Sequence, residues 1–262
     1  MSLHVLAAEE GFVPPTTGDF WQPLIGDGAF AITRSMFVIV ISVAVIAGFM
    51  LLVARNMSVV PGKLQFAGEG LYNFVRNSVA IDILGSRNFR PFLPLLLTQF
   101  LLILVNNWFG VIPPIQFPTF GRIGFAVALT LITFVVYHAV GIRRKGLGGY
   151  FRGLMPPGIP GWIAPLVYVL ELITFFVTRP LTLGMRLFAN MFAGHMLMLV
   201  FILGGEYMLL EGSNLFVNIS SVGAFVMAIV MTFFELLVQF LQAYVFVLLT
   251  ALYIAGSLAD EH

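Results

Sequence analysis

Residues 215–258 read LFVNISSVGAFVMAIVMTFFELLVQFLQAYVFVLLTALYIAGSL and contain a single charged residue, Glu235, and no proline. As one helix rising 1.5 Å per residue, this stretch would be roughly 65 Å long, about twice the ~30 Å hydrocarbon core of a bilayer. Ordinary tilts of ~20° recover little of that excess. The stretch must either break into two spans or cross the membrane very obliquely against other protein. Because nothing in it resembles a loop, we predict one long, strongly tilted helix.

The composition of the whole chain indicates a membrane protein. Of its 262 residues, 60% are apolar and 10% are charged, and the mean hydropathy is +1.00. A soluble domain carries about 25% charged residues, which excludes an ordinary water-soluble enzyme, a nucleic-acid binder and a disordered linker. Cysteine is absent, so disulfides, thiolate catalysis and cysteine-based metal sites are excluded as well. We predict one all-α integral membrane domain over residues 1–262.

Four further stretches have the length and apolar character of membrane helices, which need about 20 residues. They are Ser35–Ala54, Phe92–Ile112, Ile123–Ile142 and Ile163–Leu203. The last of them is interrupted by only a few charges, and a short acidic, glycine-containing stretch at residues 204–214 separates it from the long stretch at 215–258. We therefore predict about five membrane helices, with the last two forming an antiparallel, strongly tilted hairpin over residues 161–258.

The remaining segments connect these helices. Residues 1–33 are expected to form an outer arm, residues 34–145 to hold the first three spans, and residues 146–160 and 204–214 to be loops. Between the first two spans, over residues 64–85, apolar residues recur at helical spacing. They are Leu64, Ala67, Leu71, Val75 and Val79. Such an amphipathic pattern is typical of a helix that lies on the membrane surface.

The basic residues indicate the orientation. Most of them lie in the connections after the first and third spans: Arg55, Lys63, Arg76, Arg87, Arg90, Arg143, Arg144, Lys145 and Arg152. The N-terminal arm instead carries acids before its first arginine: Glu9, Glu10, Asp19 and Asp27. By the positive-inside rule, the N-terminus is expected outside and the C-terminus in the cytoplasm.

Polar residues inside the hairpin are the candidates for function, and they fall on two stripes. The first helix carries Thr182, Arg186 and Asn190 on one stripe, and the second carries Glu235, Gln239 and Gln242. His195 follows Arg186 by nine residues and so faces roughly the opposite side. The pairs Arg186–Gln242 and His195–Glu235 have nearly equal sums of residue numbers. Both pairs can therefore lie across one antiparallel interface if the helix axes are suitably rotated.

Arg186 is the most costly of these residues. Placing it among apolar neighbours costs about 2.5–3.5 kcal/mol on insertion scales, and its guanidinium group does not deprotonate. One explanation is structural: an ion pair with Glu235 or Glu171, or a side chain that reaches the membrane interface. The other is functional, because ionisable residues inside a membrane are by default functional-site candidates. Together with the cation, His195 and Glu235 could then relay protons.

Three stretches resemble subunit a of the F-type ATP synthases. Residues 179–195, RPLTLGMRLFANMFAGH, are similar to that family's signature helix. Residues 241–250, LQAYVFVLLT, resemble its last helix, and residues 107–113, NWFGVIP, resemble its outer-side turn. The likeness is closest over residues 165–258, where the spacing of the Arg, Asn, His, Glu and Gln residues is reproduced together.

The resemblance implies a proton-translocating subunit with two offset half-channels. Arg186 would face a rotating ring of c subunits, hold or release its carboxylate, and block proton leakage between the half-channels. The proton path would include Asn190, His195, Glu235 and Gln242 on the outer side and Thr182 near the cytoplasmic exit. Gln239 is also expected on this path. Glu171 would either line that exit or pair with a neighbouring side chain.

The same resemblance implies the partners. They are the c-subunit ring, the peripheral-stalk b subunits, the remaining ATP synthase subunits and the lipid bilayer of a bacterial cytoplasmic membrane. The sequence contains no G-x-x-x-x-G-K-[ST] motif, the loop that binds nucleotide phosphates. We therefore expect ATP chemistry to belong to other subunits, and this chain to be no enzyme on its own. No cofactor, metal or nucleic acid is expected.

Two other functions stay open at this point. A self-contained secondary transporter often shows an internal repeat and a midplane site made by broken helices, and no convincing repeat is visible here. A purely structural subunit would leave Arg186 without a purpose. Protons are favoured over Na⁺ as the transported ion, because the imidazole of His195 beside Glu235 is a poor ligand for Na⁺.

Three further polar residues have plainer interpretations. His138, near the end of the third span, is expected to be a hydrogen-bonded structural side chain rather than a proton relay. Asn106 and Asn107 could wet a channel entrance, but a role in a turn or helix cap is equally consistent with their position.

Overall fold

The computed structural model describes residues 12, 14–16, 18, 23–26, 31–112, 115–155, 159–212 and 214–258. The regular secondary structure within them is helical, apart from a short antiparallel pair of strands, β1 (Pro23–Ile25) and β2 (Ile32–Thr33). Five helical segments of this described part are long and apolar enough to cross a membrane. The all-α membrane fold predicted from composition is confirmed. The acidic residues of the N-terminal arm and the turn at Pro113 lie outside the described residues.

The first three spans are α1 (Arg34–Arg55), α4 (Leu93–Val111) and α5 (Ile123–Arg152). Helix α1 has an arginine at each end of an uncharged interior, and α4 starts with a proline in its first turn, where no intrahelical donor is needed. Helix α5 continues beyond the predicted span. At Gly146 the backbone takes a positive φ of 70°, and the chain turns and continues as helix to Arg152. The prediction of a loop from residue 146 is therefore wrong over this part.

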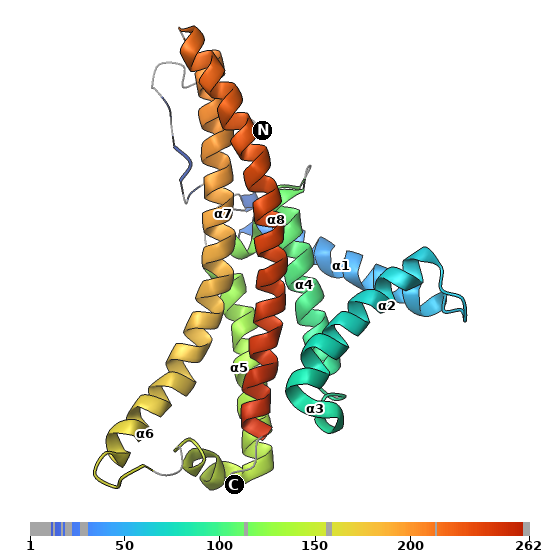
Figure 1. Ribbon diagram of the computed structural model, residues 1–262, viewed down its shortest axis with the longest axis vertical. Helices are drawn as coiled ribbons and strands as arrows, with labels where there is room; N and C mark the ends of the chain where they lie inside the picture. Colours follow the sequence, from blue (N-terminus) through green and yellow to red (C-terminus); the bar gives the residue numbers. More distant parts are fainter. Residues whose placement is uncertain are drawn as a thin grey trace.

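The amphipathic segment forms α2 (Lys63–Val75), the π-helical turn η4 (Arg76–Ile81) and α3 (Asp82–Asn88). Its second half buries Val75 and Val79 as predicted, against α4 and α8. Its first half buries a different face, because Leu64 is exposed and Gly68 is buried. A Cβ atom on Gly68 would lie 2.7 Å from Val53 of α1, so the glycine lets the two helices touch. In Figure 1, α1 and α2 together project sideways from the other helices.

The hairpin is present, and both of its arms are longer than a bilayer requires. The first arm runs without interruption through α6 (Ala164–Ile173), the π-helical turn η6 (Thr174–Thr178) and α7 (Arg179–Leu210), 47 residues in all. The second arm is the single helix α8 (Leu215–Leu258), 44 residues long. Figure 1 shows α7 and α8 side by side and antiparallel, with α6 diverging from α8. The bend follows from the π-helical turn and the proline at the start of α7.

The loop predicted at residues 204–214 is also shorter than expected, because α7 continues to Leu210. Gly205 does not end the helix. It is buried against α8, and a Cβ atom there would come within 3.3 Å of Ala224 and 3.4 Å of Phe225. Small residues in membrane helices commonly permit such close helix packing. Glu206, predicted to lie in a solvated loop, is therefore on the last turns of α7.

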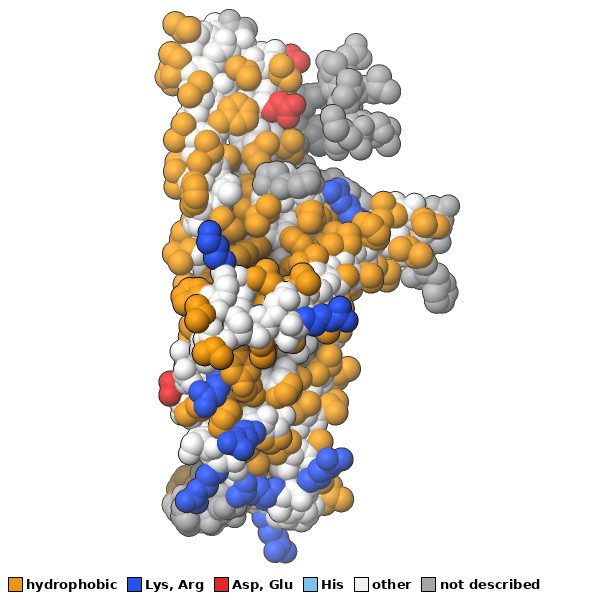
Figure 2. Space-filling view, turned by 90° about the vertical axis from the view of Figure 1, so that its right-hand side faces the viewer, with side chains coloured by type: hydrophobic (Ala, Val, Ile, Leu, Met, Phe, Trp, Pro, Cys, Tyr) orange, Lys and Arg blue, Asp and Glu red, His pale blue; other side chains and the backbone are white. Residues whose placement is uncertain are grey.

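Helix α8 is at the centre of the packing, in contact with α4, α5, α7 and η4. Fully buried side chains in this core include Leu96, Phe100, Ile103, Tyr137, Leu183, Leu187, Phe246 and Ile254. A polar link crosses this core, where Gln99 donates to Thr133 at 3.0 Å and Thr133 lies 3.4 Å from Thr250. Outside the core, apolar side chains cover most of the visible surface (Figure 2), as expected of helices that face lipid.

Replacing Gly141 by alanine tests the packing at the end of α5. The added Cβ would collide with the ring of Tyr150, which folds back onto Gly141 after the kink at Gly146. Overpacking of this kind costs about 1–3 kcal/mol. We expect Gly141→Ala to lower the thermal stability of the purified complex. Gly148→Ala, on the same helix with nothing within 4 Å of the new Cβ, is the control and should leave stability unchanged.

Candidate functional site

The predicted stripe on α7 is exposed along its whole length. Thr182, Arg186 and Asn190 are all accessible on the surface of the chain. The Thr182 hydroxyl donates to the backbone carbonyls of Thr178 and Arg179, at 2.7 Å and 3.1 Å. Its hydrogen bonds are therefore to the backbone of the same helical segment, and none is to Arg186.

Arg186 forms no hydrogen bond, ion pair or ring contact with the part of the chain that the structure describes. Neither Glu235 nor Glu171, the two acids considered for an internal ion pair, is bonded to it. The other arginine of the hairpin, Arg179, differs, because its guanidinium lies 3.5 Å from the centre of the Phe175 ring and 5.3 Å from that of Tyr253. Arg186 thus presents a permanent positive charge on an apolar helix surface.

One turn beyond Arg186 the exposed stripe connects to the interior. The side-chain amide of Asn190 donates to Gln242 Oε1 on α8 at 2.8 Å. Gln242 is buried, with 3% of its surface exposed, and its Nε2 makes no hydrogen bond with the described residues. The predicted Arg186–Gln242 pairing is replaced here by Asn190–Gln242, a shift of one helical turn along the same interface.

The second predicted stripe is buried between α7, α8 and α4. Glu235 and Gln239 have 5% and 2% of their surfaces exposed. Gln239 Nε2 donates to Glu235 Oε1 at 2.8 Å and lies 3.6 Å from the sulfur of Met191. Glu235 Oε2 is buried and makes no hydrogen bond with the described residues. A carboxylate in such a place is costly unless it is protonated or solvated, which suits a group that exchanges protons.

His195 is brought to the same interface. Its ring has 5% of its surface exposed and hydrogen-bonds to the backbone of Gly110 at the end of α4. Its neighbour Gly194 lies directly against Glu235, since a Cβ atom there would be 2.9 Å from Glu235 Oε1. His195 and Glu235 are both buried in the helix packing of the hairpin, and Gly194, the neighbour of His195, lies against Glu235. The absence of a side chain at Gly194 makes room for the carboxylate.

Two site residues were not assigned from the sequence. Asn107 neither caps nor turns the chain: it is buried, and its side-chain amide donates to the backbone carbonyl of Gln239 at 3.3 Å. It thereby attaches α4 to the polar stripe of α8. The other is Gly194, whose role depends on a contact across the hairpin. Asn106 is buried as well, but its amide donates to Ser42 on α1 at 2.7 Å, away from this stripe.

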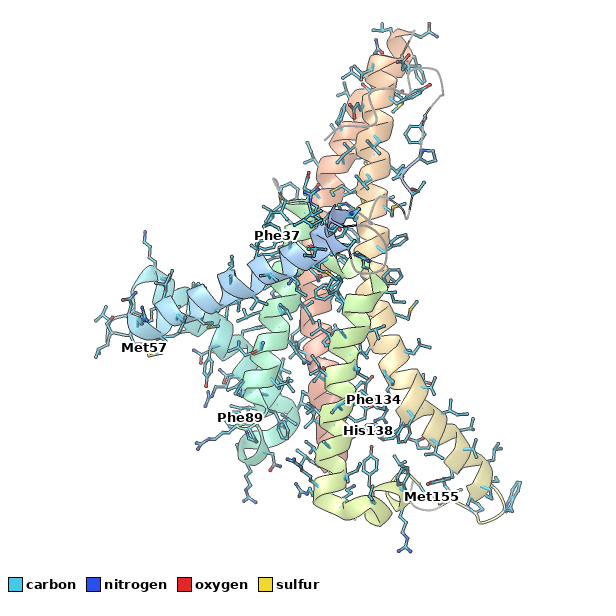
Figure 3. The ribbon with its side chains drawn as sticks, turned by 180° about the vertical axis from the view of Figure 1, so that it is seen from behind. Phe37, Met57, Phe89, Phe134, His138 and Met155 are labelled. Carbon is cyan, nitrogen blue, oxygen red and sulfur yellow. The ribbon has the colours of Figure 1, made fainter. Side chains whose placement is uncertain are left out.

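The remaining candidates, Glu171 and His138, lie away from the buried polar residues of the hairpin. Glu171 lies on α6, half-buried and without a hydrogen bond or ion pair to the described residues. It precedes Arg186 by fifteen residues, or roughly 22 Å along a helix. His138 lies on α5 beside Phe134 (Figure 3), and its ring centre is 4.1 Å from that of Phe134 and 4.6 Å from that of Phe176. Both of its nitrogens lack hydrogen bonds with the described residues, so the predicted hydrogen-bonded histidine is wrong.

Comparison with known proteins agrees with this arrangement. The model of a protein family described as "ATP synthase A chain" matches residues 36–255. The chain belongs to the ATP synthase subunit a family. Subunit a of Nocardioides sp. is 46% identical over 270 residues, covering 98% of this chain and 96% of the relative. The subunits of Pseudarthrobacter chlorophenolicus and Streptomyces lividans are 43% and 37% identical, and each covers at least 96% of this chain and 90% of the relative.

As a member of the subunit a family, the chain is an integral membrane subunit of an ATP synthase and not itself a catalytic enzyme. The relatives named above are bacterial. This agrees with the long apolar helices, with the resemblance seen in the hairpin sequence, and with the lack of a nucleotide-binding motif in the sequence. The effect of a substitution at this site is therefore measured as ATP synthesis by the whole complex.

Replacing Gly194 by alanine tests the position of Glu235. The new Cβ would lie 2.9 Å from Glu235 Oε1 and 3.0 Å from its Cδ, which forces the carboxylate to move. We expect Gly194→Ala to reduce ATP synthesis in membrane vesicles several-fold. Combining it with Glu235→Asp, which shortens the side chain by one methylene, should restore part of the loss.

The control for this prediction is Gly204→Ala on the same helix, where nothing lies within 4 Å of the added Cβ. Its ATP synthesis should equal that of the wild type. Equal activity of Gly194→Ala and Gly204→Ala would show that the position of the carboxylate is unimportant.

Proposed function

We propose that this chain is the proton-translocating subunit of its ATP synthase and couples proton flow to rotation of a ring of c subunits. The observation that carries the proposal is that Arg186 is charged, exposed and not paired with an acid of the described chain. Its charge cannot be removed by deprotonation, it is exposed on a mainly apolar helix, and no acid in the described part of the chain pairs with it. A carboxylate supplied by a neighbouring subunit provides the missing partner.

The physical chemistry of that partner produces directed movement. A ring carboxylate must be neutral to face lipid and is attracted to Arg186 when it is charged. Loss of its proton near the arginine and gain of a proton on the other side therefore occur at different angular positions of the ring. Each proton moving down 100 mV supplies ~2.3 kcal/mol. Arg186, placed between the two positions, repels a proton that would pass directly from one to the other.

The buried polar residues beside Arg186 support a path from the outside. His195, Glu235 and Gln239 lie in the α4–α7–α8 interface, and the bond between Asn190 and Gln242 leads from this interface to the surface that carries Arg186. We infer that protons enter along this series. Thr182 and Glu171 lie further toward the start of the hairpin, and we assign them to the exit on the opposite side.

We infer the orientation from the distribution of charge. Lysine and arginine side chains gather in the lower part of the molecule in Figure 2, and acidic side chains are visible near its upper end. The positive-inside rule then puts the lower end in the cytoplasm of the bacterial cell, with the N-terminus outside. Residues 1–262 would form one membrane domain, bounded by lipid, the c ring and the b subunits of the peripheral stalk.

Replacing Arg186 by alanine tests the proposal directly. We expect ATP synthesis driven by a proton gradient to be lost, because the ring carboxylate has no cation to meet, while the complex still assembles. Arg143→Gln, which removes an exposed arginine of α5 outside the hairpin, is the control and should retain synthesis. If Arg186→Ala vesicles make ATP at the wild-type rate, the proposed role of the arginine is wrong.

Exchanging His195 and Glu235 tests the relay. If the two side chains pass a proton between them, the double variant His195→Glu with Glu235→His should keep more ATP synthesis than either residue changed singly to alanine. A swapped enzyme no more active than the single variants contradicts a relay. Repeating the measurement with a Na⁺ gradient at fixed pH distinguishes the transported ion, because a proton path predicts no synthesis under that condition.

A further inference from the structure

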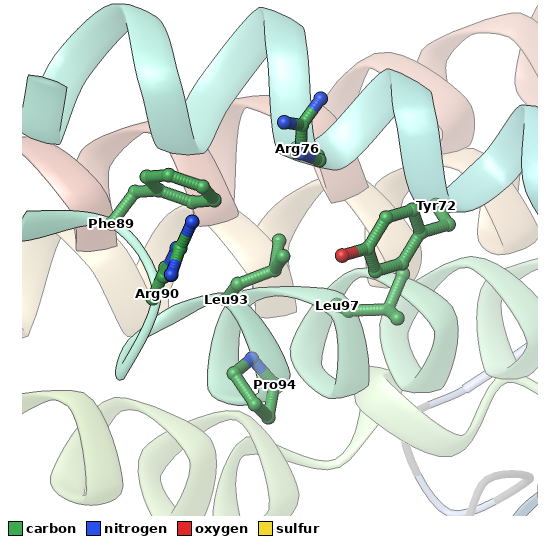
Figure 4. Close-up of a pocket in the computed structure, with 7 residues that line it drawn as sticks. All are labelled: Tyr72, Arg76, Phe89, Arg90, Leu93, Pro94 and Leu97. Carbon is green, nitrogen blue, oxygen red and sulfur yellow. The ribbon is translucent and has the colours of Figure 1, made fainter. Parts of the chain in front are cut away.

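A second polar site lies away from the hairpin, where the amphipathic segment meets the start of α4. It is a cavity of about 490 Å³, within the 300–1,000 Å³ of typical small-molecule sites. Two arginines line it, Arg76 from η4 and Arg90 from the connection to α4. Figure 4 shows both of their side chains, together with Tyr72, around the space above Leu93.

The charge of this cavity is not balanced by the chain. Among the described residues that line it there is no Asp or Glu. Arg76 Nη1 donates to the neutral amide oxygen of Asn77 at 2.9 Å, and its guanidinium lies 5.6 Å from the centre of the Phe89 ring. Arg90 is exposed and makes no hydrogen bond or ion pair with the described residues. The two guanidinium groups are therefore available to an anion with several oxygens, which they bind in bidentate fashion.

The rest of the cavity is apolar. Leu93, Pro94 and Leu97 belong to the first turns of α4, the fourth helix of the chain and one of its membrane spans. A site for a small soluble anion would not need this surface. A phospholipid needs both parts, a cationic site for the phosphate and an apolar surface for the beginning of its acyl chains. Basic pockets between membrane helices are known to suit anionic headgroups.

We propose that this cavity binds an anionic phospholipid, with its phosphate between Arg76 and Arg90 and its acyl chains along Leu93 and Leu97. The site does not depend on the proton path, because none of its residues belongs to the hairpin. A bound lipid would fasten α2 and η4 to α4 and so support the arm that α1 and α2 form beside the other helices (Figure 1).

The test uses the whole ATP synthase reconstituted with phosphatidylglycerol that carries a photoactivatable group on one acyl chain. In the wild type, light should attach the lipid to the peptide that contains Leu93 and Leu97. The double variant Arg76→Gln with Arg90→Gln should be labelled about thirtyfold less, the loss expected when two cations near a membrane surface are removed. Arg143→Gln with Arg152→Gln, which removes two exposed arginines outside the cavity, should be labelled like the wild type.

Three further arms distinguish the alternatives. Leu97→Trp fills the apolar part and keeps both charges, so its labelling should fall even if the arginine variant does not assemble. Phosphatidylcholine with the same photoactivatable chain should label the peptide far less, and equal labelling overturns the proposal. Radioactive inorganic phosphate should not bind the detergent-solubilised enzyme at this site. Phosphate binding that requires both arginines also overturns it.

Discussion

The hydrocarbon core of a bilayer supplies no hydrogen-bond partner, and this constraint governs the arrangement of every polar group on the long hairpin. A polar side chain there must be satisfied by the neighbouring helix, by its own backbone, or by something outside the chain. The hairpin uses all three solutions. Gln239 bonds Glu235 inside the interface, Thr182 bonds the carbonyls of its own helix, and Arg186 makes no bond with the described residues.

Polar side chains that bond within the chain hold the helices together, whereas Arg186, which does not, is the candidate for function. The bonds from Asn107 to Gln239 and from Asn190 to Gln242 join three helices around a polar interior, and each of them resembles an ordinary structural contact. Arg186 differs because its charge is permanent and its cost is large. A structural role would have paired it with Glu235, which lies on the facing helix of the same hairpin. Glu235 instead bonds a glutamine, and the arginine is left on the surface.

The length of the hairpin has a consequence for the path. Two helices of this length exceed the ~30 Å core of a bilayer, and in the proposed function they cross it obliquely. An oblique hairpin distributes its polar residues sideways as well as in depth. Under that proposal the buried group around Glu235 and the more distant Thr182 and Glu171 would open to opposite sides of the membrane at different lateral positions. Directed rotation of a neighbouring ring would require such an offset.

The sequence predicted the faces of the hairpin helices better than the buried face of the amphipathic segment. The stripes on α7 and α8 follow from helical periodicity, since both helices are regular over the site. The buried face of α2 does not follow from it. There Gly68 contacts Val53, and the π-helical turn that begins at Arg76 changes the direction of later side chains. The composition of residues 204–214 suggested a loop, but Gly205 lies within α7 and packs against α8.

The sequence by itself determined that this is an all-α membrane protein with an uninterrupted final helix, and it determined which residues are chemically unusual. Composition, periodicity and the cost of a membrane arginine depend on residue type and order, which the sequence contains in full. Only the tertiary structure decided that Gln242 bonds Asn190, that Asn107 reaches Gln239, and that Arg76 and Arg90 border one cavity. Those contacts join residues far apart in the chain, and they depend on how closely and at what rotation the helices pack. That geometry is set by many small side-chain contacts at once, and no local pattern records it.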